Sequence, residues 1–107
     1  MYEVTVDQLA EAHADGAYVL DVREPMEFVQ ARVPGAVLLP LSQVHAHLSA
    51  LPRDRTIYVI CATGNRSRTA ATWLTHAGFD ACSVAGGTMG WARSGRPVVS
   101  GREAGAA

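Results

Sequence analysis

Residues 57–67 read Ile57-Tyr58-Val59-Ile60-Cys61-Ala62-Thr63-Gly64-Asn65-Arg66-Ser67. A run of apolar, mostly β-branched residues ends at a cysteine, and a short polar loop then leads into a helical pattern. This order predicts a buried strand, a turn and a helix, with Cys61 where the strand ends. The first N–H groups of a helix have no partner within the helix and carry positive partial charge, so they attract anions. Because the same groups would lower the pKa of a thiol beside them, the position predicts that Cys61 is a nucleophile.

The rest of the chain repeats this alternation of strand and helix signals. Five strands are expected, at residues 3–6, 18–22, 36–39, 56–60 and 80–84. Helices are expected after each of them, at residues 7–15, 25–31, 40–51, 66–76 and 88–93. The strands at 18–22 and 56–60 are almost continuously apolar, which is typical of parallel strands covered by helices on both faces. The expected fold class is therefore α/β, with a parallel sheet between layers of helices.

The length of the chain predicts a single domain. At 107 residues it is long enough to bury a core without disulfides or a metal. We place the domain at residues 1–99. Residues 100–107 are small and weakly charged, and we expect them to form a flexible C-terminal tail.

The composition argues against several classes of partner. Apolar residues make up 49% of the chain, charged residues 18%, and the formal net charge is −1. This balance predicts neither disorder nor a nucleic-acid-binding or membrane-surface patch. No apolar stretch approaches the roughly 18 residues of a membrane span, and acidic residues interrupt the N-terminal segment where a signal peptide would be apolar. We expect a soluble, cytoplasmic protein without membrane or nucleic-acid partners.

Several kinds of chemistry lack the residues they need. All 9 basic residues are arginine, which excludes Schiff-base lysine chemistry and a Walker-type phosphate loop. His45 and His47 are two positions apart, so on a helix they would point in different directions and could not share a metal. The glycines of residues 85–90 follow a strand, but the first glycine of a dinucleotide-binding fingerprint is absent. We expect no metal site and no cofactor.

The second cysteine has a different expected role. Cys82 lies early in its strand, whereas Cys61 lies at the end of its own. If these parallel strands are neighbours, an offset of about three residues at ~3.3 Å each separates the two sulfurs by about 10 Å or more. Because a disulfide cannot span that distance, Cys82 is interpreted as part of the core and not as a resolving thiol.

Four separated motifs mark the ends of the expected elements. They are Asp21-Val22-Arg23-Glu24 followed by Glu27-Phe28, then Val33-Pro34-Gly35-Ala36, the loop 61–67, and Gly86-Gly87 with Trp91 and Gly95-Arg96-Pro97. In sequence and order they resemble single-domain rhodaneses (thiosulfate sulfurtransferases) over roughly residues 4–97. One departure is Ala31-Arg32, where the family usually has Gly-His. The resemblance implies a rhodanese-like three-layer α/β/α sandwich around a five-stranded parallel sheet.

The resemblance also implies a reaction. The Cys61 thiolate would attack the outer sulfur of a thiosulfate-like donor and keep it as a persulfide, which a thiol, cyanide or a protein acceptor would then collect. Backbone N–H groups of the loop would hold the anionic sulfur, with Arg66 adding positive charge for the sulfonate end. The implied substrate-binding residues are Ala62, Thr63, Gly64, Asn65, Arg66 and Ser67.

Loop length separates this reaction from that of related folds. Arg66 is the fifth residue after Cys61, whereas cell-cycle phosphatases of similar fold place the arginine sixth. The shorter loop would close too tightly around a phosphoryl group and favours a sulfur atom. Arsenate reduction on the same loop and a non-catalytic binding or sensing module are the alternatives. The intact cysteine favours an enzyme over such a module.

Asp21 and Arg23 have two interpretations. They end a predicted strand on the side where ligands of parallel sheets bind. Asp21 could pair with an arginine of the site and Arg23 could steer the donor, which would make both supporting residues. Alternatively, the two form a structural ion pair that ties loops together. The sequence favours neither.

Overall fold

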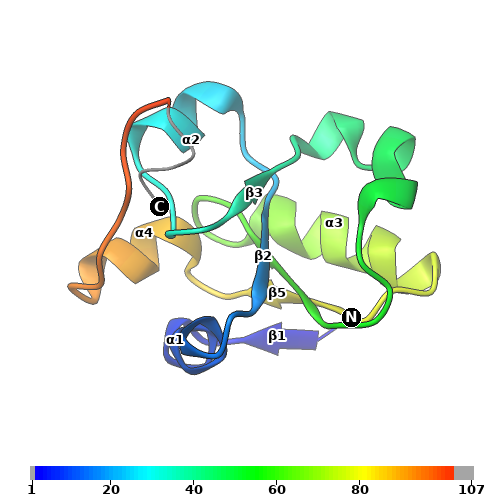
Figure 1. The fold of residues 1–107 in the computed structure, drawn as a ribbon, viewed down its shortest axis with the longest axis horizontal. Coiled ribbons are helices and arrows are strands. Elements are labelled where there is room, and N and C mark those ends of the chain that lie inside the picture. The colour runs from blue at the N-terminus through cyan, green and yellow to red at the C-terminus, as the bar shows by residue number, and fades with distance from the viewer. Residues whose placement is uncertain (1, 103–107) are drawn as a thin grey trace.

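The computed structural model describes residues 2–102, which form an α/β/α sandwich (Figure 1). The strands are β1 (Tyr2–Val4), β2 (Tyr18–Asp21), β3 (Val37–Leu38), β4 (Ile57–Ile60) and β5 (Ala81–Val84). The α-helices are α1 (Val6–Ala14), α2 (Pro25–Gln30), α3 (Asn65–His76) and α4 (Gly87–Arg93). The five expected strands are all present, with ends that differ from prediction by at most two residues. The predicted α/β class and the three-layer arrangement are confirmed.

The strands form one parallel sheet in the order β1-β5-β4-β2-β3. The central strand is β4, where Tyr58 lies opposite Val19 of β2 on one side and opposite Cys82 of β5 on the other. Because all strands are parallel, the carboxyl ends of β2, β4 and β5 meet at one edge of the sheet. Cys61 directly follows β4, so it lies at the middle of that edge.

Both faces of the sheet are covered, as the almost continuously apolar strands predicted. On one face, α3 and the segment between β3 and β4 bury the side chains of Leu20, Val44, Ile57, Val59, Ala70 and Leu74. On the other face, α1 and α4 bury the side chains of Leu9, Val19, Val33, Ile60, Val84 and Trp91. No helix formed by residues 2–102 is long and apolar enough to cross a membrane.

The segment 40–51 differs from its prediction as one continuous helix. It forms two short 3₁₀ helices, η1 (Leu41–Gln43) and η2 (His45–Ala50), with non-helical backbone angles at His47. The apolar spacing explains the difference, because Leu41 and Val44 are three positions apart, as are Leu48 and Leu51. A helix with three residues per turn directs each such pair to the same side, here toward the core.

The residues after α4 run back alongside the end of α2. Val99 forms an antiparallel bridge with Arg32. The Ser100 hydroxyl donates to the Gln30 carbonyl at 2.7 Å, and the Gly101 N–H donates to the Val29 carbonyl at 2.8 Å. The expected tail, 100–107, therefore begins with residues that are hydrogen-bonded to the domain, and residues 103–107 lie outside the described part of the chain.

Candidate active site

Cys61 lies between the end of β4 and the start of α3, with only 1% of its surface exposed. Its sulfur accepts hydrogen bonds from two backbone N–H groups, that of Gly64 at 3.1 Å and that of Ser67 at 3.3 Å. Gly64 immediately precedes α3 and has a φ of 124°, a backbone conformation that side-chain-bearing residues rarely adopt. The glycine thus lets the loop turn its N–H groups back toward the sulfur.

These hydrogen bonds set the protonation of the thiol. Burial alone would raise the pKa of Cys61, but hydrogen bonds from the Ser67 side chain and from the N–H groups of Ser67, Gly64 and Thr63 outweigh that effect. The net result is a pKa below the ordinary cysteine value. Since the thiolate is the reactive form of cysteine, the loop raises the fraction of Cys61 that can act as a nucleophile.

Arg66 directs its guanidinium to a carboxylate on α2. Nη1 and Nη2 of Arg66 contact the two carboxylate oxygens of Glu27 at 2.7 and 2.9 Å. The hydrogen bonds from Arg66 lower the pKa of Glu27 to about 2, and a hydrogen bond from the Glu24 N–H adds to the effect. This partner of Arg66 was not predicted from the sequence. The contact depends on β2 and β4 being neighbours in the sheet, which brings the segments that follow them to one edge, and no local sequence pattern indicates that adjacency.

Glu27→Gln should lower the free energy of unfolding at pH 7 by less than about 1 kcal/mol, since both members of the pair are partly exposed. Glutamine keeps an oxygen for the Glu24 N–H, so the substitution removes mainly the ion pair. The folded-state pKa of Glu27 lies below its ordinary value of 4.5, so the stabilisation is complete above that pH and is lost as the pH falls toward 2. Urea unfolding of both proteins should give free energies that converge from pH 7 to pH 3. A gap that keeps its size at pH 3 would contradict this assignment.

Asp21 and Arg23 form a buried ion pair with a shortest N–O distance of 2.7 Å. Arg23 also donates to two backbone carbonyls of the α2 segment, that of Ala31 at 2.7 Å and that of Glu27 at 3.3 Å. The pair therefore joins the end of β2 to both turns of α2. Through α2 it holds the backbone of Glu27, the residue that contacts Arg66.

The glycine pair before α4 packs against the active loop from the other side. The Thr88 N–H donates to the Cys61 carbonyl at 2.8 Å, and the Met89 N–H donates to the Ala62 carbonyl at 3.1 Å. Gly87 has a φ of 59°, and a Cβ atom at this position would lie 2.4 Å from the Cys61 carbonyl oxygen. The absence of a side chain at Gly87 is thus what allows α4 to approach and hold the loop (Figure 1).

The remaining predicted loop residue lies away from the sulfur. The Asn65 side chain accepts a hydrogen bond from Arg68 at 2.7 Å, one turn further along α3. The loop therefore brings Thr63, Gly64 and Ser67 to the Cys61 sulfur. The Asn65 side chain instead contacts Arg68 of α3.

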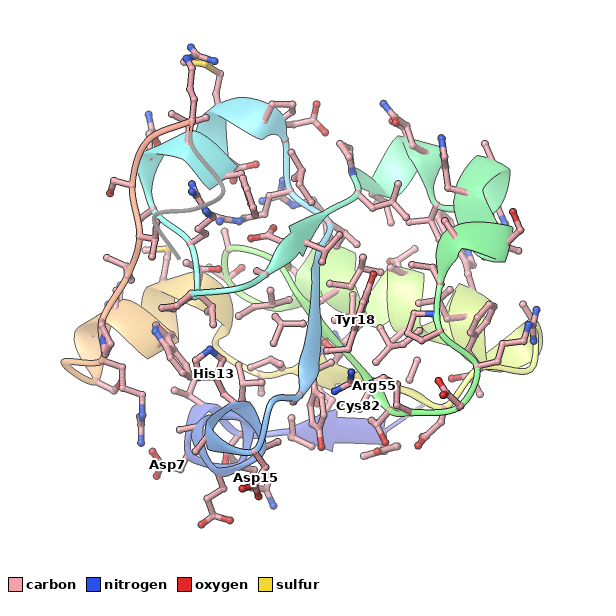
Figure 2. The ribbon with its side chains drawn as sticks, viewed as in Figure 1. Asp7, His13, Asp15, Tyr18, Arg55 and Cys82 are labelled. Carbon is pink, nitrogen blue, oxygen red and sulfur yellow. The ribbon has the colours of Figure 1, made fainter. Side chains whose placement is uncertain are left out.

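Cys82 takes no part in this cluster. It is fully buried, and burial raises the pKa of its thiol to about 11. Its register partner on β4 is Tyr58, three residues before Cys61, so the offset expected from the sequence is present. Figure 2 shows Cys82 near β1, away from the loop that follows β4, and both cysteines are free thiols. Among residues 2–102, no group of three or more histidine, cysteine, aspartate or glutamate side chains is placed to hold a metal ion.

The fold and the site together define the class of protein: a parallel α/β domain with a buried cysteine at the carboxyl edge of its sheet, whose sulfur accepts hydrogen bonds from backbone N–H groups. The family model of the rhodanese-like domain matches residues 5–94. The chain belongs to this family, as the four motifs predicted.

Two relatives and one solved structure illustrate the match. A sulfurtransferase of Allochromatium vinosum is 34% identical over 101 residues, covering 92% of this chain and 94% of the relative. The probable adenylyltransferase/sulfurtransferase MoeZ of Mycobacterium tuberculosis is 39% identical over 82 residues, which is 74% of this chain but only 21% of that protein. The crystal structure of a rhodanese-related protein from Thermoplasma volcanium superimposes with a TM-score of 0.87 at 34% identity, covering 92% of this chain and 98% of that one. These relationships support sulfur transfer as the general activity.

Proposed function

We propose that this protein is a sulfurtransferase of the rhodanese type, which carries sulfane sulfur as a persulfide on Cys61. Thiosulfate or a similar small molecule is the donor, and a thiol, cyanide or a protein is the acceptor. The observation that carries the proposal is the convergence of the Gly64 and Ser67 N–H groups on the Cys61 sulfur. Such donors stabilise a sulfur anion both before and after transfer.

The reaction proceeds in two displacements. In the first, the Cys61 thiolate attacks the outer sulfur of thiosulfate, a new sulfur–sulfur bond forms, and the bond within thiosulfate breaks so that sulfite leaves with the electron pair. In the second, cyanide or an acceptor thiolate attacks the terminal sulfur of the persulfide. Thiocyanate or an acceptor persulfide is released, and the Cys61 thiolate returns. The positive end of α3 stabilises the sulfur anion in both steps.

Intact-protein mass spectrometry after brief treatment with thiosulfate tests this proposal. Wild type should gain the mass of one sulfur atom, cyanide should remove it, and Cys61→Ser should show no gain. Cys82→Ala is the matched control, because it removes the other thiol and should gain sulfur as wild type does. A gain that survives in Cys61→Ser would refute Cys61 as the carrier. No gain in folded, reduced wild type would refute thiosulfate as donor and favour a binding module.

A further inference from the structure

Ser83 is a buried polar residue in β5 that the reaction above does not use. None of its surface is exposed. Its register partner is Val59 of β4, and it shares a strand face with Ala81, which packs in the α3-covered core. A hydroxyl on such an apolar face destabilises the fold unless it is hydrogen-bonded. Within residues 2–102, its hydrogen-bond partner is the Ser67 hydroxyl, with the two oxygens 2.7 Å apart.

Ser67 has one hydroxyl proton and three neighbours that compete for it. Besides Ser83, its oxygen lies 3.1 Å from the Gly64 carbonyl oxygen and 3.5 Å from the Cys61 sulfur. The Gly64 carbonyl also accepts the Arg68 N–H at 3.2 Å. The Ser67 proton can therefore leave that carbonyl without leaving a buried acceptor unpaired.

The two protonation states of Cys61 require different positions of the Ser67 proton. When Cys61 is a thiol, its S–H donates to the Ser67 oxygen, and the Ser67 proton is directed to the Gly64 carbonyl. When Cys61 is a thiolate, the sulfur can only accept, so its hydrogen bond with Ser67 persists only if the Ser67 proton turns toward the sulfur. In both states the Ser67 oxygen has a lone pair for the Ser83 proton, and within residues 2–102 the Ser83 hydroxyl has no other side-chain or backbone acceptor.

We propose that Ser83 is a positioning residue of the active site: its hydroxyl donates to Ser67 and so directs the single Ser67 proton to the Cys61 sulfur whenever that sulfur is anionic. A hydroxyl that accepts a hydrogen bond is a stronger donor, so the chain from Ser83 through Ser67 strengthens the bond to the thiolate. The proposal rests on Cys61 being the nucleophile of the proposed function. The charged groups around the loop are already paired, Arg66 with Glu27 and Asp21 with Arg23.

The test follows the alkylation rate of Cys61 by iodoacetamide as a function of pH, with peptide mass spectrometry to read Cys61 alone. Ser83→Ala should raise the pKa of Cys61 by about half a unit to one unit, slowing alkylation below that pKa by about three- to tenfold. Cys82→Ala is the matched control: it alters the neighbouring buried residue of β5, on the opposite face, and should leave the profile unchanged.

A second variant separates positioning from a general structural effect. If Ser83 acts through Ser67, then in a Ser67→Ala background the further substitution Ser83→Ala should not move the profile again. An unchanged profile in folded Ser83→Ala, or an equal shift in the Ser67→Ala background, would overturn the proposal. The assay needs no sulfur donor. A shifted profile without persulfide formation from thiosulfate would therefore count against thiosulfate transfer alone, and persulfide formation with an unshifted profile would refute the role of Ser83 alone.

Discussion

Gly87→Ala should destabilise the protein by about 3 kcal/mol or more and remove most of its sulfur uptake. The new Cβ would lie 2.4 Å from the Cys61 carbonyl oxygen and 2.5 Å from that of Ala62, and both are backbone atoms that cannot rotate away. In addition, the left-handed backbone at this position disfavours alanine by roughly 1–2 kcal/mol. Because α4 must move away to relieve the clash, the hydrogen bonds from Thr88 and Met89 to the loop would be lost.

The control for this prediction is Gly86→Ala. Gly86 also has a left-handed backbone, with a φ of 87°, but a Cβ atom there would have its nearest neighbours 3.8 Å away. Gly86→Ala therefore has the energetic cost of a left-handed backbone but brings the new Cβ atom into no clash. Urea unfolding should give a clearly larger loss for Gly87→Ala, and intact-mass measurement after thiosulfate should show reduced uptake in that variant only. Equal losses in the two variants would show that the contact with the loop is unimportant.

Asp21→Asn should destabilise the protein by about 3–5 kcal/mol, because it leaves the buried Arg23 guanidinium without a neutralising charge. The side chain of Asp21 is fully buried and that of Arg23 is 6% exposed, so water cannot take over the role of the carboxylate. Substitution should also loosen α2, whose backbone carbonyls Arg23 holds. Urea unfolding measures the loss of stability.

Two further variants control for the cause of this loss. In the double variant Asp21→Asn/Arg23→Met no buried charge is left unpaired, so part of the stability should return. Glu3→Gln removes a widely spaced surface pair with Arg68, at 3.9 Å, and should have an effect below about 1 kcal/mol. If Asp21→Asn lowered the free energy of unfolding no more than Glu3→Gln does, the ion pair between Asp21 and Arg23 would not be important for stability.

Features that depend on local pattern could be predicted from the sequence. The apolar runs that form β2 and β4, and the position of Cys61 between a strand and a helix, follow from residues close together in the chain. The prediction of one helix over residues 40–51 is wrong, because apolar spacings of three and four residues fit either helix type over so short a distance.

Pairings between elements could not be predicted in the same way. The contact between Arg66 and Glu27, and that between Ser67 and Ser83, join residues from different strand–helix units. Each depends on which strands are neighbours, here β2 beside β4 and β4 beside β5. A local pattern carries no information about that order. For Asp21 and Arg23, the sequence offered a functional and a structural interpretation, and only the burial and geometry of the pair show what Arg23 contacts.

The sheet order also has a consequence for how the protein is made. Within residues 2–102, the edge strand β1 pairs with β5 alone, so that Tyr2 lies opposite Cys82. Of the five strands of this sheet, β1 leaves the ribosome first during synthesis and its neighbour β5 leaves last. Contacts between such distant parts of the chain form slowly, because a long loop must close before they stabilise anything. The sheet can therefore be completed only after translation has passed β5. We expect the domain to reach its native state as one unit after that point, and not strand by strand during synthesis.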